Sequence, residues 1–175
     1  MKPTLDFIQN IATQAGGILQ NLADTDLNIQ HKSRKDLVTK ADYESEQFLI
    51  DAILTKYPSH SIIAEETGKH AGDAGYQWFI DPLDGTLNYA HGMPIYAVSI
   101  GFAYQGKLEM GVVYDPSRKE LFSAQRGGGA TLNGHPIRVG NQTDLIECMV
   151  ISGFPHGINN PCDEKWANYM SLSQK

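Results

Sequence analysis

Two aspartates, Asp81 and Asp84, follow directly after the apolar run Trp78-Phe79-Ile80. Pro82 lies between them and restricts the backbone of the turn. A pair of carboxylates at the end of a buried strand is costly unless a cation compensates the charge. Hard oxygen ligands at this density are those that Mg²⁺ prefers. The pattern therefore predicts a magnesium site at the end of this strand.

Gly85 and Thr86 come next, at a point where a short helix can begin. Amides at a helix N-terminus form an anion site, so a phosphate cradle would lie beside the metal ligands. That adjacency is what metal-assisted phosphoryl transfer requires. The alternative is that Asp84-Gly85 is an ordinary turn and Asp81 a cap. The apolar strand before the motif and the D-G-T-x-N-Y continuation favour the functional interpretation.

A second acidic pair, Glu65 and Glu66, follows the apolar run Ile62-Ile63-Ala64. Ligands gather at strand ends in α/β sheets. Adjacent residues on extended backbone face opposite ways, so one of the two glutamates can reach a site that the other cannot. Alone, the pair would be a solvated acidic loop. Beside the aspartate motif, we expect it to belong to the site.

A helix-capping pattern, Thr39-Lys40-Ala41-Asp42, precedes the acidic pair along the chain. Asp42 has two interpretations that the sequence leaves open: it completes the cap, or it is the partner of the Thr86 hydroxyl. A basic cluster lies upstream and is expected in a polar, mobile loop, with a flap over a phosphate site as the sharper alternative. This cluster contains His31, Lys32, Arg34 and Lys35.

The elements that must position these residues follow from hydrophobic spacing. Apolar residues at helical spacing predict a helix over residues 4–23 and a second helix that starts at the capping pattern 39–42 and is ended by Pro58. Short strands are predicted at 27–30, 61–64 and 77–80, and a polar loop at 69–75. From residue 96 to residue 124, short turns between apolar runs predict an antiparallel meander. A strand at 147–152, with Cys148 in the core, and a helix at 166–172 complete the prediction.

Composition limits the class of protein. The chain has 175 residues, of which 41% are hydrophobic and 19% charged, so it can bury a core. The net charge of -6 argues against nucleic-acid binding. An acidic surface also repels phosphate, which is a further reason to expect a divalent cation.

The cysteines and the apolar runs predict a compartment. Two cysteines without C-x-x-C spacing suit a reducing cytoplasm, and scattered histidines disfavour zinc. The first residues do not form a signal peptide, and no apolar run reaches the length of a membrane span. We therefore expect a cytoplasmic protein with neither a membrane nor a nucleic acid as partner.

Four segments in the same order resemble the inositol monophosphatase family, most closely its bacterial members. They are DLVTKAD at 36–42, IIAEETG at 62–68, WFIDPLDGTLNYAHG at 78–92, and the segment 111–134. The resemblance implies an α+β layered αβαβα sandwich. This chain would hold the N-terminal helices and the antiparallel sheet as one incomplete domain over residues 1–175, with the second α/β half largely missing.

The resemblance also implies roles for particular residues. Two or three Mg²⁺ ions would be bound by Glu65, Asp81, Asp84 and the carbonyl of Leu83. The substrate phosphate would be held by Gly85 and Thr86 at the site formed with Glu65, Leu83 and Asp84. Thr86 and Asp42, assisted by Glu65, would orient a water for direct in-line attack, with no covalent intermediate. Lithium sensitivity and a homodimer are further expectations from the family.

The expected substrate is inositol 1-phosphate or a similar small phosphate monoester. Sister families cleave adenosine 3′,5′-bisphosphate or sugar bisphosphates, and the short spacing from Glu65 to Asp81 favours the compact monophosphatase. Family members carry a late W-D-x-A-A motif whose aspartate completes one metal site, and that motif is absent from these 175 residues. A non-catalytic, truncated interaction module is therefore the alternative from another class of function.

Overall fold

The computed structural model describes residues 1–23, 30–33, 36–149 and 151. The chain divides into two compact units, Met1–Arg138 and Val139–Lys175. Among the described residues, the first contains every helix and strand except one short 3₁₀ helix. The prediction of a single domain over the whole length stays a prediction.

Two long helices precede most of the strands. Helix α1 (Leu5–Leu22) begins after Thr4, whose hydroxyl accepts a hydrogen bond from the amide of Phe7. Helix α2 (Lys40–Lys56) begins with the predicted capping box. The Thr39 side chain accepts a hydrogen bond from a backbone amide of the first turn, and the Asp42 carboxylate accepts one from the Thr39 amide. Both helices match their predicted ranges to within a residue or two at each end.

Eight strands form one sheet in the order β10-β9-β8-β7-β6-β5-β3-β4. All neighbours are antiparallel except β3 and β5, which run parallel. The mixed sheet and its helices confirm the α+β class and the predicted meander. The strands are β3 (His60–Ala64), β4 (Gly68–His70), β5 (Asp73–Asp84), β6 (Ala97–Tyr104), β7 (Lys107–Asp115), β8 (Glu120–Gln125), β9 (Gly129–Leu132) and β10 (His135–Ile137).

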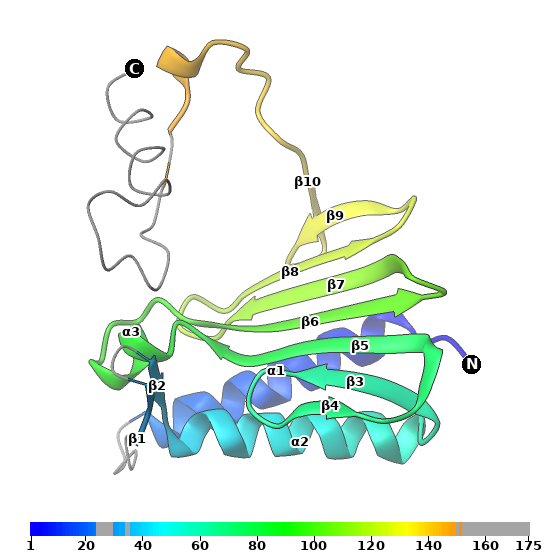
Figure 1. Cartoon of the computed structure of the whole chain (residues 1–175). Helices are drawn as coiled ribbons and strands as arrows, with labels where there is room; N and C mark the ends of the chain where they lie inside the picture. The colour runs from blue at the N-terminus through cyan, green and yellow to red at the C-terminus, as the bar shows by residue number, and fades with distance from the viewer. Residues whose placement is uncertain (24–29, 34–35, 150, 152–175) are drawn as a thin grey trace, which may run out of the picture. The chain divides into compact units, whose positions relative to one another are not determined.

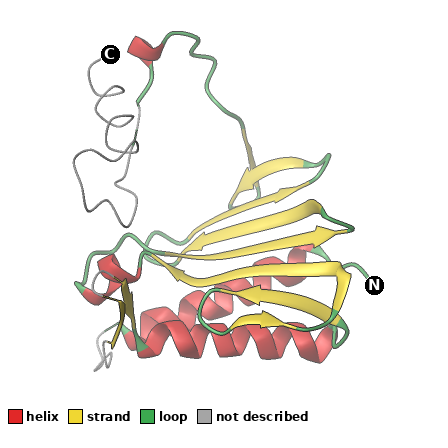
Figure 2. Cartoon of the chain, in the orientation of Figure 1, coloured by secondary structure: helices red, strands yellow, loops and turns green. Residues whose placement is uncertain are grey.

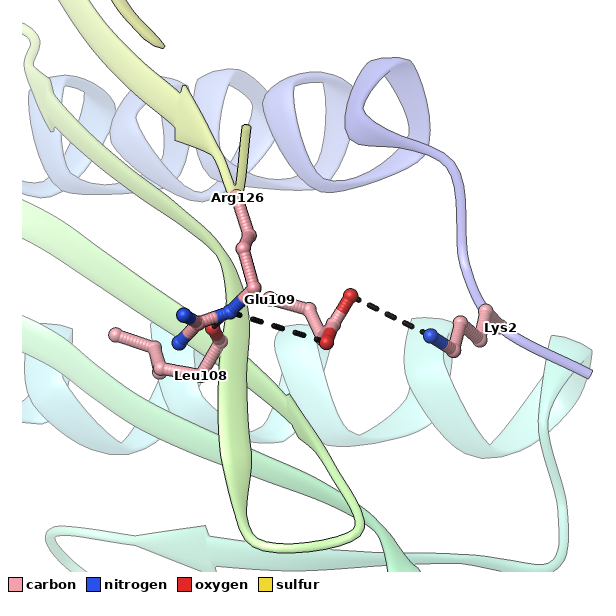
Figure 3. Close-up of polar contacts among 4 residues, drawn as sticks. All are labelled: Lys2, Leu108, Glu109 and Arg126. Atoms are coloured by element: carbon pink, nitrogen blue, oxygen red, sulfur yellow. Dashed lines mark hydrogen bonds and ion pairs between the residues drawn. The ribbon is translucent and has the colours of Figure 1, made fainter. Parts of the chain in front are cut away.

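Both long helices cover the same face of this sheet (Figures 1 and 2). Helix α1 packs on β6, β7 and β8, and α2 packs on β3 and β5. The largest side chains buried between these layers are Trp78 and Phe102, both fully enclosed. The N-terminal segment is fastened to the edge of the same unit by Glu109, which pairs with Lys2 at 3.3 Å and Arg126 at 3.9 Å (Figure 3).

The other face of the sheet is apolar and hollowed. Side chains alternate across a strand, so Ile63 and Phe79 point away from the helices while Ile62 and Trp78 point toward them. Ile63 and Phe79 line a cavity of about 570 Å³ that extends to Leu108 and Phe122. Glu65, which follows β3, and Asp81, within β5, also line this cavity, as described below.

Several local predictions were wrong. Residues 31–33 are not a loop, because β1 (Gln30–Ser33) pairs antiparallel with β2 (Asp36–Val38). Residues 69–75 are not a simple loop either, because Ile62 pairs with His70 and draws this polar segment into the sheet as β4. Sequence pattern did not show these pairings because polar edge strands lack the alternation on which the prediction relied.

The predictions at the end of the chain fare differently. Where a strand was predicted, the described residues hold the short helix η1 (Leu145–Glu147) and no strand. Cys148 is an exposed free cysteine and not a core residue. Its apolar neighbours Ile146 and Met149 are exposed as well, so among the described residues this segment contributes to no core. The predicted helix at 166–172 and most of the predicted strand at 27–30 lie outside the described residues. No helix in the part of the chain described here has the length and apolarity of a membrane span.

Candidate active site

Parallel pairing of β3 with β5 brings Glu65 beside Asp81. Ala64 is opposite Ile80 in the register, and the amide of Glu65 donates to the carbonyl of Ile80 at 3.2 Å. Parallel strands end at the same edge of a sheet, so the next residue of each strand meets the other. By alternation, both carboxylates share the face of Ile63 and Phe79, and both line the apolar cavity.

The electrostatics of Asp81 reflect this crowding. Its carboxyl is half-buried, and it is hydrogen-bonded to Glu65. Burial, this hydrogen bond and the charges of Glu65 and Asp84 together raise the pKa of Asp81 to about 8, although the Leu83 amide opposes the shift by donating at 3.2 Å. Without a cation, Asp81 therefore holds a proton at neutral pH.

A β-bulge in β5 separates Asp81 from Asp84. Asp81 lies opposite Ser99 and Asp84 opposite Ala97, so one strand advances by three residues where its partner advances by two. Pro82, within the bulge, has no amide to leave unpaired there. The side chain of Leu83 is 1% exposed and anchors the bulge, whereas Asp84 is exposed. The bulge thus keeps the Leu83 carbonyl and both aspartates within one short segment.

The two interpretations of Asp42 both hold in the structure. One carboxylate oxygen, Oδ2, accepts from the Thr39 amide at 2.8 Å and from the Thr39 hydroxyl at 2.6 Å. The other oxygen, Oδ1, is 3.0 Å from the Thr86 hydroxyl. That hydroxyl is also 3.0 Å from the Leu83 carbonyl oxygen, and its single proton can serve only one of these acceptors at a time.

The predicted short helix is present as α3 (Thr86–Ala90), with Gly85 at its N-cap. Gly85 has φ 94°, a left-handed conformation that glycine adopts without strain. A Cβ atom at this position would lie 2.9 Å from the carbonyl oxygen of Ile95. Only glycine therefore allows the chain to turn from Asp84 into Thr86 at this point.

The residues present suit a hard divalent cation in their chemistry. In the described part of the chain, no three Asp, Glu, His or Cys side chains are already spread around a point as a complete metal site. Glu65 and Asp81 instead lie side by side at the edge of the apolar cavity. Among the same residues, no lysine or arginine pairs with Glu65, Asp81 or Asp84. The donor set is therefore carboxylate and carbonyl oxygen with uncompensated charge, which fits Mg²⁺.

The structure leaves some candidates outside the site and adds others. His91 is exposed, and its ring contacts the carbonyl of Leu87. Lys32 lies in β1, and Arg34 is outside the described residues. Sequence analysis missed Ser45 and Glu46, both fully buried on α2. Their spacing from Asp42 places all three on one helix face, and polar residues interrupting an apolar stripe were the available signal.

Comparison with known proteins defines the family. The chain belongs to the inositol monophosphatase family, whose model matches residues 1–174. Among curated relatives, the Nus factor SuhB of Pasteurella multocida is 44% identical over 158 residues, which are 89% of this chain and 59% of that protein. The Nus factor SuhB of Pseudomonas aeruginosa is 42% identical over 177 residues, covering 98% of this chain and 65% of that protein.

Solved structures agree with this assignment. The IMPase of Thermotoga maritima matches with a TM-score of 0.77 and 36% identity, over 82% of this chain and 56% of that one. An inositol monophosphatase from Anabaena matches with a TM-score of 0.69 and 42% identity, over 80% of this chain and 50% of that one. The chain thus spans between half and two thirds of the length of these relatives.

Proposed function

We propose that this protein is a Mg²⁺-dependent phosphomonoesterase that acts on inositol 1-phosphate or a similar small phosphate monoester. The observation that carries the proposal is the position of Glu65 and Asp81, which follow paired residues of β3 and β5 and line one cavity, with Asp84 three residues further on. The site would hold two or three Mg²⁺ ions through Glu65, Asp81, Asp84 and the Leu83 carbonyl. Family membership supports the same chemistry.

The residues of this chain have separate tasks in the proposed reaction. Asp42 accepts a hydrogen bond from the Thr86 hydroxyl, which leaves the oxygen of Thr86 free to accept a hydrogen bond from a water on its other side. Glu65, which lines the cavity beside Asp81, would take a proton from that water. The amides of Gly85 and Thr86 lie next to Asp84 and would bind the phosphate oxygens. When bound, Mg²⁺ would supply charge neutralisation and activation of the attacking water.

The direct test is phosphate release from inositol 1-phosphate by the purified chain, with Mg²⁺ and with EDTA. We expect release only with Mg²⁺ and its inhibition by Li⁺. A parallel assay with adenosine 3′,5′-bisphosphate and fructose 1,6-bisphosphate distinguishes the sister activities. A folded chain that binds Mn²⁺ but releases no phosphate from any of these substrates would contradict the proposed activity while leaving the metal site intact.

Replacement of Thr86 by alanine is expected to lower turnover by about 10²-fold with little change in KM. The reason is that the hydroxyl between Asp42 and Leu83 is lost, and with it the group that orients the attacking water, an effect at the lower end of the roughly 10²–10⁴-fold typical of a positioned proton-transfer group. Steady-state kinetics would measure the effect, with Thr86→Ser as the matched control because serine retains the hydroxyl. Equal turnover in wild type and Thr86→Ala would remove Thr86 from the water-orienting role.

A non-catalytic role is the second candidate. Two observations favour it: the curated relatives bear the name Nus factor, and the described residues do not form a complete metal site by themselves. In this case the chain would act through a protein surface, with a homodimer as the assembly expected of the family. Size-exclusion chromatography with light scattering would establish the oligomeric state. Absence of Mn²⁺ binding by the folded chain would favour this candidate.

A further inference from the structure

One face of helix α2 contacts every segment of the candidate site. Asp42, Ser45 and Glu46 lie at positions i, i+3 and i+4, and each is at most 1% exposed. Asp42 reaches the Thr86 hydroxyl at the start of α3. Ser45 and Glu46 reach two other segments, and the roles proposed above do not use either residue. Three buried polar side chains on one helix face destabilise the fold unless each has a hydrogen-bond partner.

Glu46 holds the turn that carries Glu65. Its oxygen Oε2 accepts from the amide of Glu66 and its Oε1 from the amide of Thr67, both at 2.8 Å. The amide of Glu66 belongs to the peptide group that begins at Glu65. On the other side, the amide of Glu65 is bonded to the Ile80 carbonyl. The backbone of Glu65 is therefore held on both sides, by strand β5 before its Cα and by Glu46 after it.

Ser45 acts on Asp81 through a single peptide group. Its hydroxyl donates to the carbonyl of Pro82 at 3.0 Å in a buried contact. The same peptide group carries the amide of Leu83, which donates to Oδ1 of Asp81 at 3.2 Å. Because a peptide group is planar, fixing its carbonyl also fixes the direction of its N–H. Ser45 thereby determines where the bulge presents a donor to the Asp81 carboxylate.

We propose that Ser45 and Glu46 are positioning residues, which hold Asp81 and Glu65 together at the strand edge before any cation binds. The inference deepens the proposed function and rests on it. The charge-assisted bonds from two amides to one carboxylate are stronger than neutral hydrogen bonds, so Glu46 is the more important of the two. Rigid backbone anchors on a buried helix fix the positions of both carboxyl groups, as a preorganised site requires.

The test compares four variants of the full chain. Glu46→Gln keeps the shape but offers one acceptor for two amides, and Ser45→Ala removes the donor to Pro82. Glu44→Gln is the charge-matched control, because Glu44 is exposed on the same helix and pairs with Lys40. Ile53→Val is the stability control, because Ile53 is a core residue of α2 with no polar group. Thermal midpoints are measured for all four.

Two readouts follow, and the first needs no metal. In EDTA, hydrogen exchange at the amides of Glu66 and Thr67 should accelerate about tenfold or more in Glu46→Gln and remain unchanged in both controls. Mn²⁺ binding, followed by electron paramagnetic resonance, should weaken about tenfold in Glu46→Gln and severalfold in Ser45→Ala. It should stay within about twofold in Glu44→Gln and Ile53→Val, even where Ile53→Val lowers the thermal midpoint.

Either of two results would overturn the inference: wild-type exchange at Glu66 and Thr67 in Glu46→Gln, or Mn²⁺ binding in Ile53→Val that weakens as much as in Glu46→Gln. If Glu46→Gln fails to fold, Ser45→Ala decides the question, since it deletes a single oxygen. Absence of Mn²⁺ binding by the wild-type protein would contradict the proposed function. In that case the exchange experiment still reports whether Glu46 holds the turn.

Discussion

Asp81→Asn is expected to abolish Mg²⁺-dependent phosphate release, with a loss of at least about 10²-fold, and to leave the fold intact. Asp81 lies at the centre of the site. Its carboxyl accepts a hydrogen bond from the Leu83 amide, and the neighbouring Glu65 and Asp84 both raise its pKa. Asparagine keeps the size of the side chain but removes the negative charge that Asp81 would offer to a bound Mg²⁺. Residues that only support a metal ligand typically cost about one to two orders of magnitude in affinity or activity when replaced, and we expect loss of a ligand to cost at least as much.

The control for this prediction is Asp73→Asn. Asp73 is exposed at the start of the same strand, and its carboxylate accepts from the Gly75 amide, which asparagine can still satisfy. We expect Asp73→Asn to keep wild-type activity. Mn²⁺ titration of the same variants separates lost binding from lost chemistry. Full activity of Asp81→Asn at saturating Mg²⁺ would show that Asp81 is not a ligand.

In the absence of metal, the same substitution is expected to stabilise the protein at high pH. The pKa of Asp81 is raised from 3.8 to about 8, so between these values the folded state binds more protons than the unfolded state. The free energy of unfolding therefore falls as pH rises through this window. Because solvent screens a half-buried group, we expect a gain of about 1–3 kcal/mol for Asp81→Asn at pH 8 rather than the full linkage value.

Urea unfolding in EDTA at pH 5 and pH 8 measures this effect. Wild-type protein should lose stability between the two values, and Asp81→Asn should lose less. Addition of Mg²⁺ at pH 8 should restore the wild-type protein and leave the variant unchanged, because a ligand stabilises only the state that binds it. A variant with the wild-type pH dependence would mean that Asp81 does not hold the proton.

Acidification below about pH 6 is expected to destabilise the protein through His60. This histidine is 2% exposed and stacks between Tyr57 at 4.8 Å and Tyr76 at 4.7 Å. Burial and then the charge of the N-terminal amine lower the pKa of His60 from 6.5, opposed by a bond to the Met1 backbone and by Asp73. The side chain of Trp78 also donates to Nδ1 of His60 at 2.9 Å, and a protonated Nδ1 cannot accept that bond.

The sign follows from linkage. A lowered pKa means that the unfolded state binds the proton more readily, so the contribution of His60 is fully present above pH 6.5 and is lost as pH falls. The loss approaches about 1.4 kcal/mol for each pH unit below 6.5, until the pKa of the folded state is reached. His60→Gln should remove this dependence but cost about 2–4 kcal/mol at pH 7, since it opens the aromatic stack.

Thermal unfolding between pH 4.5 and pH 7.5 checks this prediction. His91→Gln is the control, because His91 is exposed and bonds only a local carbonyl. We expect this variant to follow the wild-type curve. An acid dependence in His60→Gln as steep as that of the wild type would assign the effect to carboxylates elsewhere in the chain.

The sequence by itself determined the elements and the chemical type of the site. Helix α1, the capping box of α2 and the meander from β6 to β8 follow from spacing and turn residues, which are local properties of the chain. The D-P-x-D-G-T motif predicted hard-oxygen ligands next to a helix start, and α3 begins at Thr86. These features could be predicted because each depends on neighbours within a few residues.

The tertiary structure alone decided how these pieces meet. The parallel pairing of β3 with β5 puts Glu65 within a hydrogen bond of Asp81, although 16 positions separate them in the sequence. Likewise, the packing of α2 on both strands gives Ser45 and Glu46 their partners, and only that packing buries them. Strand pairing and burial depend on contacts distant in sequence, which no local pattern encodes. The physical reason is that a side chain's pKa and partners are set by the neighbours that the fold brings to it.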